Sequence, residues 1–372
     1  MRPEIESRYY RTFMYQPTDR VPDVEFGYWP QTIRRWLGEG LPKEFESECT
    51  KMFSPALDAH LGLDAPEYLR INLRCGIHPG FPEEILEQRP DGSIIRRDAS
   101  GVIAHRWPNE ADGSSIPHFI KFPVECPDDW RALKEHYRLD DPIRQADTEN
   151  IEKVRARMST RMITVGATGF YGQLRNWMGM ENLSVAFYDY PEMIHDMVEH
   201  WSELIAGQID ALPADILIDH ISWWEDMASK NGPLVSPRVF REFLQPGYHR
   251  VMTAVKKRGC VLGIVDSDGN PHDIVPNWLE EGVNIMFPLE VSAGVDPYAW
   301  RREWGMELRV KGAIAKVPLV QGGCAIDREL ERVKPLLDQG GCIPHLDHLV
   351  PPDISFKNYC EYLEKKRRMI GK

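Results

Sequence analysis

The sequence predicts a (β/α)8 barrel of the TIM type, with an N-terminal extension and a β-hairpin insertion. From residue 160 onward, short apolar segments alternate with amphipathic helical segments, a pattern typical of parallel β/α units. Six strand-like segments fall within 162–348, and two weaker ones lie upstream, which together make the eight strands that close a barrel. The alternative is a doubly wound sheet, but no Gly-x-Gly-x-x-Gly motif follows any of these strands.

The predicted elements follow in order along the chain. Strands are expected over 21–28, 65–72, 162–167, 215–221, 260–265, 283–290, 308–314 and 341–348. Helices are expected over 191–212, 236–259 with a break at Pro246-Gly247, 270–282, 296–305, 327–338 and 355–369. Ser236-Pro237, Asn270-Pro271 and Asp296-Pro297 each pair a capping side chain with a proline, which is typical of helix starts.

Residues 83–122 interrupt this pattern. They contain two strand-like segments around Pro90-Asp91-Gly92 and a second turn at Ser100-Gly101. No linker or internal repeat accompanies them. We therefore expect one domain over residues 1–372, with 83–122 as a β-hairpin insertion.

Composition limits the classes of partner. With 57 acidic and 45 basic residues the net charge is -12, so a nucleic-acid partner is not expected. The sequence shows neither a signal-peptide pattern nor an apolar run of about 18 residues, so we expect a cytoplasmic protein without a membrane span. Seven scattered cysteines without a Cys-x-x-Cys disfavour a disulfide framework. The basic run over 365–368 is interpreted as a solvated helix end.

Barrel active sites lie at the carboxyl ends of the strands, so the residues at those ends are the candidates. They are Glu25, Tyr28, Asn72, residues 168–171, His220, Trp223, Trp224, Glu225, Asp226, Asp266, Asp268, Glu290, Lys311 or Lys316, His345, Asp347 and His348. Carboxylates, imidazoles and aromatic rings of this kind are typical of a metal or acid–base pocket. Tryptophans more often belong to the core, but Trp223, Trp224 and Tyr28-Trp29 would also suit a wall around an aromatic ring or a quaternary ammonium group.

The segment Asp266-Ser-Asp268-Gly-Asn270 follows an apolar strand directly. A calcium loop is excluded, because Pro271 and Asn277 occupy the positions that need glycine and an acid. Two interpretations stay open. The aspartates either accept hydrogen bonds in a strand-to-helix turn or form part of an active site.

Four segments carry a family resemblance: 16–42, 231–251, 265–270 and 345–364. In these the chain resembles the uroporphyrinogen decarboxylase-like superfamily, which includes the decarboxylase and methyltransferases that serve corrinoid proteins. The resemblance implies a (β/α)8 barrel. The decarboxylase carries an Arg-Gln-Ala-Gly-Arg motif and an aspartate after strand two, where this sequence has "EFGYWPQTIRR" and Asn72. These departures favour the methyltransferase branch.

The resemblance to the methyltransferases also implies a metal site. Their zinc is held by His-x-Cys after strand five and a cysteine after strand eight, and Asp266, Asp268 and His348 occupy those places here. This set predicts a divalent metal, most of all zinc. Its carboxylate and imidazole ligands are harder than the thiolate ligands of those methyltransferases. Proton donors are expected among Glu225, Asp226, Glu290 and His345. Substrate contacts are expected from Tyr28, Trp29, Asn72, Trp223, Trp224 and Glu290.

The expected function is therefore metal-assisted transfer of a methyl group from a small O- or N-methylated donor, such as a methoxyaromatic or a methylamine-type compound, to a corrinoid protein. The chain has no Asp-x-His-x-x-Gly cobalamin motif, so the corrinoid is expected on a partner protein. Two alternatives remain: a decarboxylase or related lyase acting on a smaller carboxylate, and a non-catalytic ligand-binding barrel. The oligomeric state stays open, with a homodimer among the options.

Overall fold

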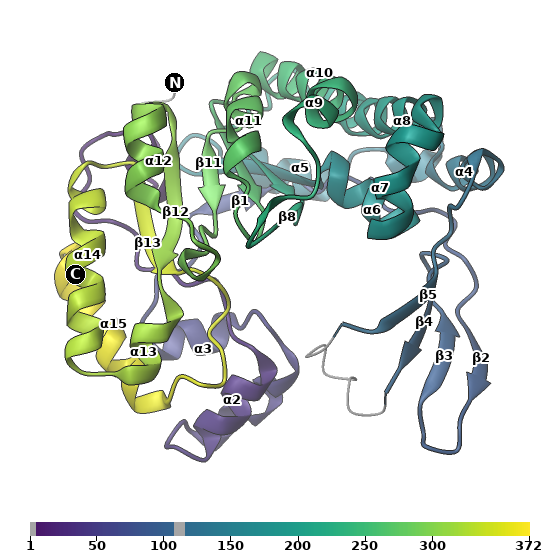
Figure 1. The fold of residues 1–372 in the computed structure, drawn as a ribbon. Helices are drawn as coiled ribbons and strands as arrows, with labels where there is room; N and C mark the ends of the chain where they lie inside the picture. The colour runs from purple at the N-terminus through teal and green to yellow at the C-terminus, as the bar shows by residue number, and fades with distance from the viewer. Residues whose placement is uncertain (1–4, 108–115) are drawn as a thin grey trace.

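A curled, parallel seven-stranded sheet forms the centre of the protein (Figure 1). The structure is a computed structural model that describes residues 5–107 and 116–372. The sheet has the order β1-β6-β7-β10-β11-β12-β13. Its strands are β1 (Tyr68–Arg70), β6 (Met162–Thr168), β7 (His220–Trp224), β10 (Leu262–Asp266), β11 (Ile285–Phe287), β12 (Arg309–Ile314) and β13 (Cys342–Leu346). The predicted barrel class is confirmed, with seven strands in the described residues instead of eight.

The predicted strand over 21–28 is the one that does not form. Its only bridge joins Tyr28 to Val350, although the segment runs beside β13. The Glu25 carboxylate accepts a hydrogen bond from the Leu346 backbone N at 3.2 Å, in the place of a strand carbonyl. The Val24 carbonyl accepts from the Lys366 ammonium at 3.0 Å. Side chains thus take over the bonds that a strand ladder would make.

Helices surround the sheet, most of them on its outer face (Figure 1). They are α1 (Arg8–Phe13), α2 (Pro30–Leu37), α3 (Pro55–His60), α4 (Pro127–Lys134), α5 (Thr148–Arg155), α6 (Phe170–Met178), α7 (Met180–Asp189), α8 (Pro191–Asp210), α9 (Pro237–Val239), α10 (Gln245–Lys257), α11 (Val275–Glu281), α12 (Pro297–Trp304), α13 (Lys316–Gln321), α14 (Cys324–Asp338) and α15 (Phe356–Ile370). Ser236 and Asp296 cap α9 and α12 as predicted. The predicted break at Pro246-Gly247 is wrong. A π-helical turn over 240–244 leads into α10, and Pro246 lies in its first turn, where no N–H partner is required.

The insertion forms an antiparallel sheet of four strands, β2 (Glu84–Gln88), β3 (Ile94–Arg97), β4 (Ile103–Arg106) and β5 (His118–Lys121). Both predicted turns are present. Asp91 accepts a hydrogen bond from the Ser93 backbone N at 3.0 Å, and Gly101 donates to the Asp98 carbonyl at 3.0 Å. The sheet projects away from the barrel (Figure 1). A short ribbon of β8 (Ala228–Ser229) and β9 (Gly232–Pro233) lies after β7.

The N-terminal extension closes the amino end of the barrel. Ile5 and, from α1, Tyr10 and Phe13 are buried against apolar side chains that point into the barrel. The strand residues of this apolar plug are Met162, Leu262, Ile264, Ile285, Phe287 and Ile343. Most of them stand near the first residues of their strands, so the open end of the barrel is the carboxyl end.

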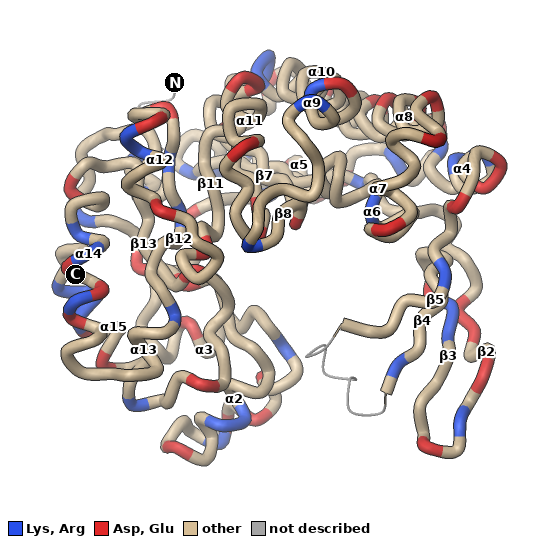
Figure 2. The backbone as a smooth tube through the Cα atoms, in the orientation of Figure 1, with Lys and Arg blue, Asp and Glu red and all other residues tan. Residues whose placement is uncertain are grey.

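The C-terminal basic run is not a uniformly solvated helix end. Charged positions of both signs are interspersed along α14 and α15 (Figure 2). Within the run, however, Lys366 is fully buried, with Nζ 2.9 Å from an Asp23 oxygen and 2.5 Å from a Glu25 oxygen. Lys366 shares the buried face of α15 with Tyr359, Tyr362 and Leu363. The solvated interpretation is thus wrong for Lys366, because α15 packs over the N-terminal segment.

Two further findings concern the chain as a whole. In the described ranges, no helix combines the length and the apolar character that crossing a bilayer requires. All seven cysteines are free thiols, four of them buried.

Candidate active site

A cavity of about 530 Å³ lies at the carboxyl end of the barrel and reaches into its interior. This volume is in the range of small-molecule sites. The polar side chains that line it include Tyr9, Tyr68, Arg70, Thr164, Gln173, His220, Ser222, Asp266 and Lys311, and the aromatic ones include Tyr137, Trp201, Trp224 and Phe287.

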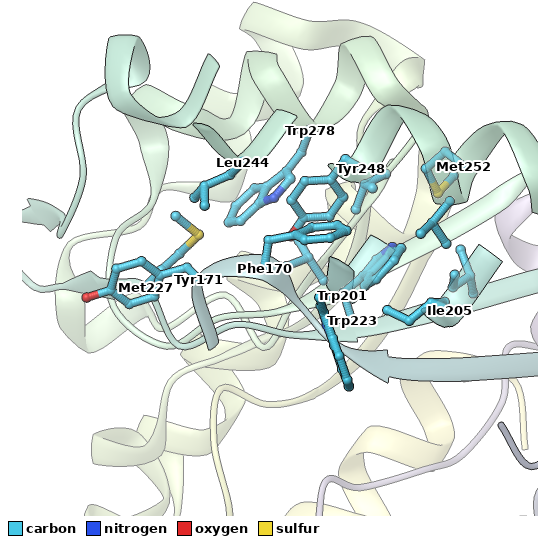
Figure 3. Packing of buried hydrophobic residues seen from close by; sticks show 14 of the residues in the cluster. Phe170, Tyr171, Trp201, Ile205, Trp223, Met227, Leu244, Tyr248, Met252 and Trp278 are labelled. Carbon is cyan, nitrogen blue, oxygen red and sulfur yellow. The ribbon is translucent and has the colours of Figure 1, made fainter. Parts of the chain in front are cut away.

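The alternation of side chains along β7 decides which tryptophan serves the cavity. Trp224 lines the cavity, and the Arg175 guanidinium lies over its ring at 4.8 Å. The neighbouring Trp223 also borders the cavity, but it is only 1% exposed and its ring packs against Phe170 and Tyr248, with centroids 5.7 and 5.1 Å away (Figure 3). The Trp223 ring is therefore part of the core, and its predicted contact with substrate stays a prediction.

Glu225 also lies on the helix side of the barrel wall. Its buried carboxylate accepts a hydrogen bond from the Gly172 backbone N at 2.6 Å and another from the Tyr248 hydroxyl. Gly172 is the third residue of α6, so Glu225 caps the N-terminus of this helix. Burial raises the pKa of Glu225 to about 7. Because it does not face the cavity, the predicted catalytic role of Glu225 is corrected to a structural one.

This cap leads to a prediction for Gly169, which precedes α6. A Cβ at Gly169 would overlap the Glu225 carboxylate, which its two hydrogen bonds hold in place. Gly169→Ala is expected to cost about 1–3 kcal/mol of unfolding free energy. Gly207→Ala is the matched control, since its Cβ meets nothing within 4 Å inside α8, and it should stabilise by about 0.5–1 kcal/mol. Urea unfolding of both variants measures this, and equal stability of the two would contradict the capping role.

Five side chains with metal-ligand atoms converge at the carboxyl ends of the strands, and we call them the acidic cluster: Asp226, Asp266, Asp268, Glu290 and His348. They form two overlapping groups, one of Asp226, Asp266 and Asp268 and the other of Asp268, Glu290 and His348. Within each group, one ligand atom per residue lies within 4.8 Å of the others. His348 Nε2 is 3.3 Å from an Asp268 oxygen.

The predicted triad of Asp266, Asp268 and His348 is therefore divided between these groups. Asp268 belongs to both, while Asp266 and His348 share no group among the described residues. Asp226 and Glu290, which were predicted to donate a proton and to contact substrate, complete the two groups. The register of the strands, which the sequence does not show, decides this membership.

The electrostatics of the acidic cluster suit a cation. Burial and neighbouring carboxylates raise the pKa values of both Asp226 and Asp266. Two basic side chains lie beside the acidic cluster: Arg175 is 3.5 Å from an Asp226 oxygen, and Lys316 is 3.2 Å from a Glu290 oxygen. Asp226 also adopts a left-handed φ of 45°, which is uncommon outside glycine. Carboxylate oxygens with one imidazole nitrogen form a donor set that fits a divalent ion such as zinc.

Buried groups behind the acidic cluster hold its ligands in position. Glu290 accepts hydrogen bonds from the Gly269 backbone N at 2.9 Å and from Lys316 Nζ at 3.2 Å. Asp347 is fully buried and accepts from the Val291 backbone N at 3.0 Å, which fixes the loop that carries Glu290. Burial raises the pKa of Asp347 to about 6. Asp347 thus supports the site from behind.

Two cationic side chains, Arg70 and Lys311, line the cavity, and we call them the basic pair. Lys311 Nζ lies 4.4 Å from the centre of the Phe287 ring, on the apolar plug, and burial lowers its pKa to about 8. Arg70 lies against Gly166, where an added Cβ would come within 2.5 Å of Nη2. Lys311 was among the strand-end candidates, but Arg70 was missed because β1 was expected to continue to Asn72.

Three further predicted residues lie outside the cavity. Tyr28 is fully buried and donates its hydroxyl hydrogen to Asp58 at 2.8 Å. Asn72 is exposed beyond the end of β1. His345 is fully buried between the rings of Phe26 and Phe287, and burial lowers its pKa well below the usual value, so it is a neutral side chain. The predicted substrate contacts of Tyr28 and Asn72 and the proton-donor role of His345 are corrected.

Trp29 lies beside the acidic cluster instead. Its ring stacks on His348 with centroids 5.9 Å apart and an interplanar angle of 19°. This contact orients the imidazole and covers one face of it. Trp29 therefore supports a ligand of the acidic cluster, and its predicted contact with substrate stays a prediction.

A parallel β/α barrel with a cavity and a cluster of carboxylates at the carboxyl ends of its strands has the architecture of the barrel enzymes. The profile of the uroporphyrinogen decarboxylase (URO-D) family matches residues 110–368, so the chain belongs to this family. The uroporphyrinogen decarboxylase of Maricaulis maris (strain MCS10) is 27% identical over 190 residues, which are 49% of this chain and 51% of that protein. The chain thus matches about half the length of this curated relative.

Solved structures show the same fold. A methyltransferase from Methanosarcina mazei superposes with a TM-score of 0.59 over 98% of both chains, at 15% sequence identity. This similarity covers the barrel together with both ends of the chain. At this identity it establishes the fold alone.

Proposed function

We propose that this protein transfers a methyl group from a small O- or N-methylated compound to a corrinoid carried by a partner protein. The observation that carries the proposal is the acidic cluster, whose ligand atoms gather at the edge of a cavity of small-molecule size. Membership of the URO-D family and the fold shared with a methyltransferase also support it. The corrinoid protein and the methyl donor are its expected partners.

One of the two groups in the acidic cluster would hold a divalent ion, most of all zinc. When bound, such an ion would act as a Lewis acid toward the heteroatom that carries the methyl group. In the transfer, the bond from the methyl carbon to that heteroatom breaks and the methyl group passes to Co(I) of the corrinoid. The heteroatom keeps the electron pair and takes up a proton. Asp226 and Glu290 are the predicted proton donors in the acidic cluster, one in each group. Because a carboxylate that binds the ion has no proton to give, we propose for this step the one that lies outside the group holding the ion.

The other cavity residues bind and orient the donor. Trp224 from β7 and Phe287 from β11 offer ring surface to the cavity, and the Arg175 guanidinium lies over the Trp224 ring. Arg175 also donates a hydrogen bond to the Asp226 carbonyl at 2.8 Å, which ties the aromatic wall to the acidic cluster.

One observation favours a second candidate, the decarboxylation of a small carboxylate. The basic pair faces the cavity, and cations are the groups that recognise a carboxylate. Membership of the URO-D family agrees with such a reaction. This candidate needs no corrinoid and would release carbon dioxide.

The test is transfer to free cob(I)alamin, followed by its absorbance change, across a panel of methoxylated and N-methylated donors. Methyl transfer from at least one class of donor is expected, with no transfer when the protein is left out. Carbon dioxide release is measured in parallel on small aromatic and aliphatic carboxylates. Release of carbon dioxide without methyl transfer across the whole panel would replace the proposal with the second candidate.

A further inference from the structure

We propose that the basic pair, Arg70 and Lys311, is a subsite for a carboxylate group of the substrate. The methyl donor is then an anionic methoxyaromatic acid and not a methylated amine. The subsite follows from the geometry of the cavity, whereas the identity of the donor rests on the proposed function.

The first argument is that both cations lack a counter-ion. In residues 5–107 and 116–372, no carboxylate oxygen comes within 4.0 Å of the Arg70 guanidinium or of Lys311 Nζ. Lys311 is largely buried over the Phe287 ring. The Asp266 carboxylate attracts its charge, but from more than 4.0 Å away. The buried charge of Lys311 is costly unless it is paired, whereas Arg70 is exposed and open to a ligand. A bound anion would supply the missing partner for both cations.

The second argument is that the backbone makes room for the guanidinium. The side chain of Arg70 lies over Gly166 and beside the Ser222 hydroxyl, and any larger residue at position 166 would displace it. A planar guanidinium is suited to bidentate recognition of a carboxylate. Ser222 lines the same cavity and offers one further hydroxyl group.

His220 completes the surroundings of the basic pair. Its Nδ1 lies 2.8 Å from the Thr164 hydroxyl, while Nε2 is buried without a hydrogen-bond partner. Burial, together with Lys311 and Arg70, lowers the pKa of this histidine to about 3, so the ring is neutral. The positive charges of Lys311 and Arg70 both disfavour protonation of the His220 ring, so both cations lie around the same region of the cavity. A neutral imidazole supplies a polar atom there without a third positive charge.

The third argument excludes the cationic donors. A quaternary ammonium group needs open aromatic faces. Of the tryptophans predicted to form such a cage, the Trp223 ring is in the core and Trp29 stacks on His348. This leaves Trp224, one ring with the Arg175 guanidinium already over one of its faces, which is not a cage. The basic pair would also repel a positively charged donor.

The arrangement suits one molecule with two polar ends. The basic pair lies toward the barrel interior, where Lys311 rests on the apolar plug, and the acidic cluster lies at the carboxyl ends of the strands. A benzene ring can carry a carboxylate on one edge and a methoxy group on the opposite edge. Such a donor meets the basic pair with its carboxylate and presents its methoxy group to the acidic cluster.

The experiment measures binding without any methyl transfer. Isothermal titration of the full chain with 4-hydroxybenzoate and with its uncharged amide, 4-hydroxybenzamide, compares ligands that differ in charge. The acid is expected to bind at least about tenfold more tightly than the amide, because a hydrogen bond to a charged group contributes about 1.5–3 kcal/mol.

Variants locate the effect. Arg70→Gln and Lys311→Met are each expected to reduce the acid-to-amide preference by about tenfold, and Arg70→Lys should retain part of it. The matched control is Arg74→Gln, since Arg74 is half exposed and paired with Asp147 at 3.6 Å. Each Kd ratio compares two ligands on one variant, so a general loss of stability does not alter it.

The outcomes separate this inference from the proposed function. Equal affinity for acid and amide, or a preference unchanged in both charge-removing variants, would overturn the subsite. Methyl transfer from N-methylated donors alone would also overturn it while leaving methyl transfer intact. Binding of the acid through the basic pair, with no methyl transfer from 4-methoxybenzoate, would support the subsite and count against the proposed function.

Discussion

Lys366→Met is expected to lower the free energy of unfolding by about 3–5 kcal/mol, because it leaves a buried carboxylate without its cation. Lys366 is fully buried, with Nζ 2.5 Å from a Glu25 oxygen and 2.9 Å from an Asp23 oxygen. Asp23 keeps Arg367 and Lys372 as partners in the variant. Glu25 retains only neutral donors, the Tyr362 hydroxyl and the Leu346 backbone N.

Lys365→Met is the matched control, one residue away on the same helix. Lys365 pairs with Asp327 and Glu361 at the surface, so its loss should cost less than about 1 kcal/mol. Urea unfolding followed by tryptophan fluorescence compares the two variants. A second substitution, Glu25→Gln, should recover part of the loss in Lys366→Met by removing the unpaired charge. If the two lysine variants were equally stable, the buried ion pair would not anchor the N-terminal segment.

Asp268→Asn is expected to remove the bound metal and to slow methyl transfer by about 100-fold or more, since Asp268 alone belongs to both groups of the acidic cluster. The expected loss of metal and of rate in Asp268→Asn is larger than in a variant of a residue that belongs to one group alone. Elemental analysis of the purified protein measures metal content, and the cob(I)alamin assay measures the rate. This prediction rests on the proposed function, but metal content is measured without any turnover.

Asp273→Asn controls for the loss of one negative charge in the same loop region. Asp273 is exposed and contacts His272 at 3.2 Å, outside the acidic cluster. Comparison of Asp226→Asn with Glu290→Gln then decides which group holds the metal, since only one of them should lose it. Unchanged metal content in Asp268→Asn would rule out the acidic cluster as the metal site.

Several features of the fold could be predicted because they depend on near neighbours in sequence. Capping by Ser236 and Asp296 requires only a side chain and the next few backbone N–H groups. The turns of the insertion depend in the same way on Asp91 and on Gly101, whose φ is positive. The prediction of a strand over 21–28 was wrong because its partner would have been β13, more than 300 residues away in sequence. There the Glu25 side chain, and not a backbone carbonyl, accepts the hydrogen bond from the Leu346 backbone N.

Candidate residues at the strand ends were predictable as a set, because chain order assigns them to the carboxyl edge of the barrel. The assignment of roles within that set was not. Trp223 and Trp224 are adjacent in sequence, yet alternation along β7 sends one into the helical layer and the other into the cavity. A shift of one residue in the start of that strand would exchange them, and the predicted strand over 215–221 began five residues before β7.

Periodicity and chain order in the sequence are thus enough to establish the parallel β/α barrel, the insertion and the edge at which polar groups collect. Tertiary structure alone decided that Asp266 and His348 fall into separate groups, that Arg70 faces the cavity, and that Lys366 is buried. Local patterns depend on bonds between residues a few positions apart. Distances between side chains on different strands depend on the stagger and tilt with which the strands pack.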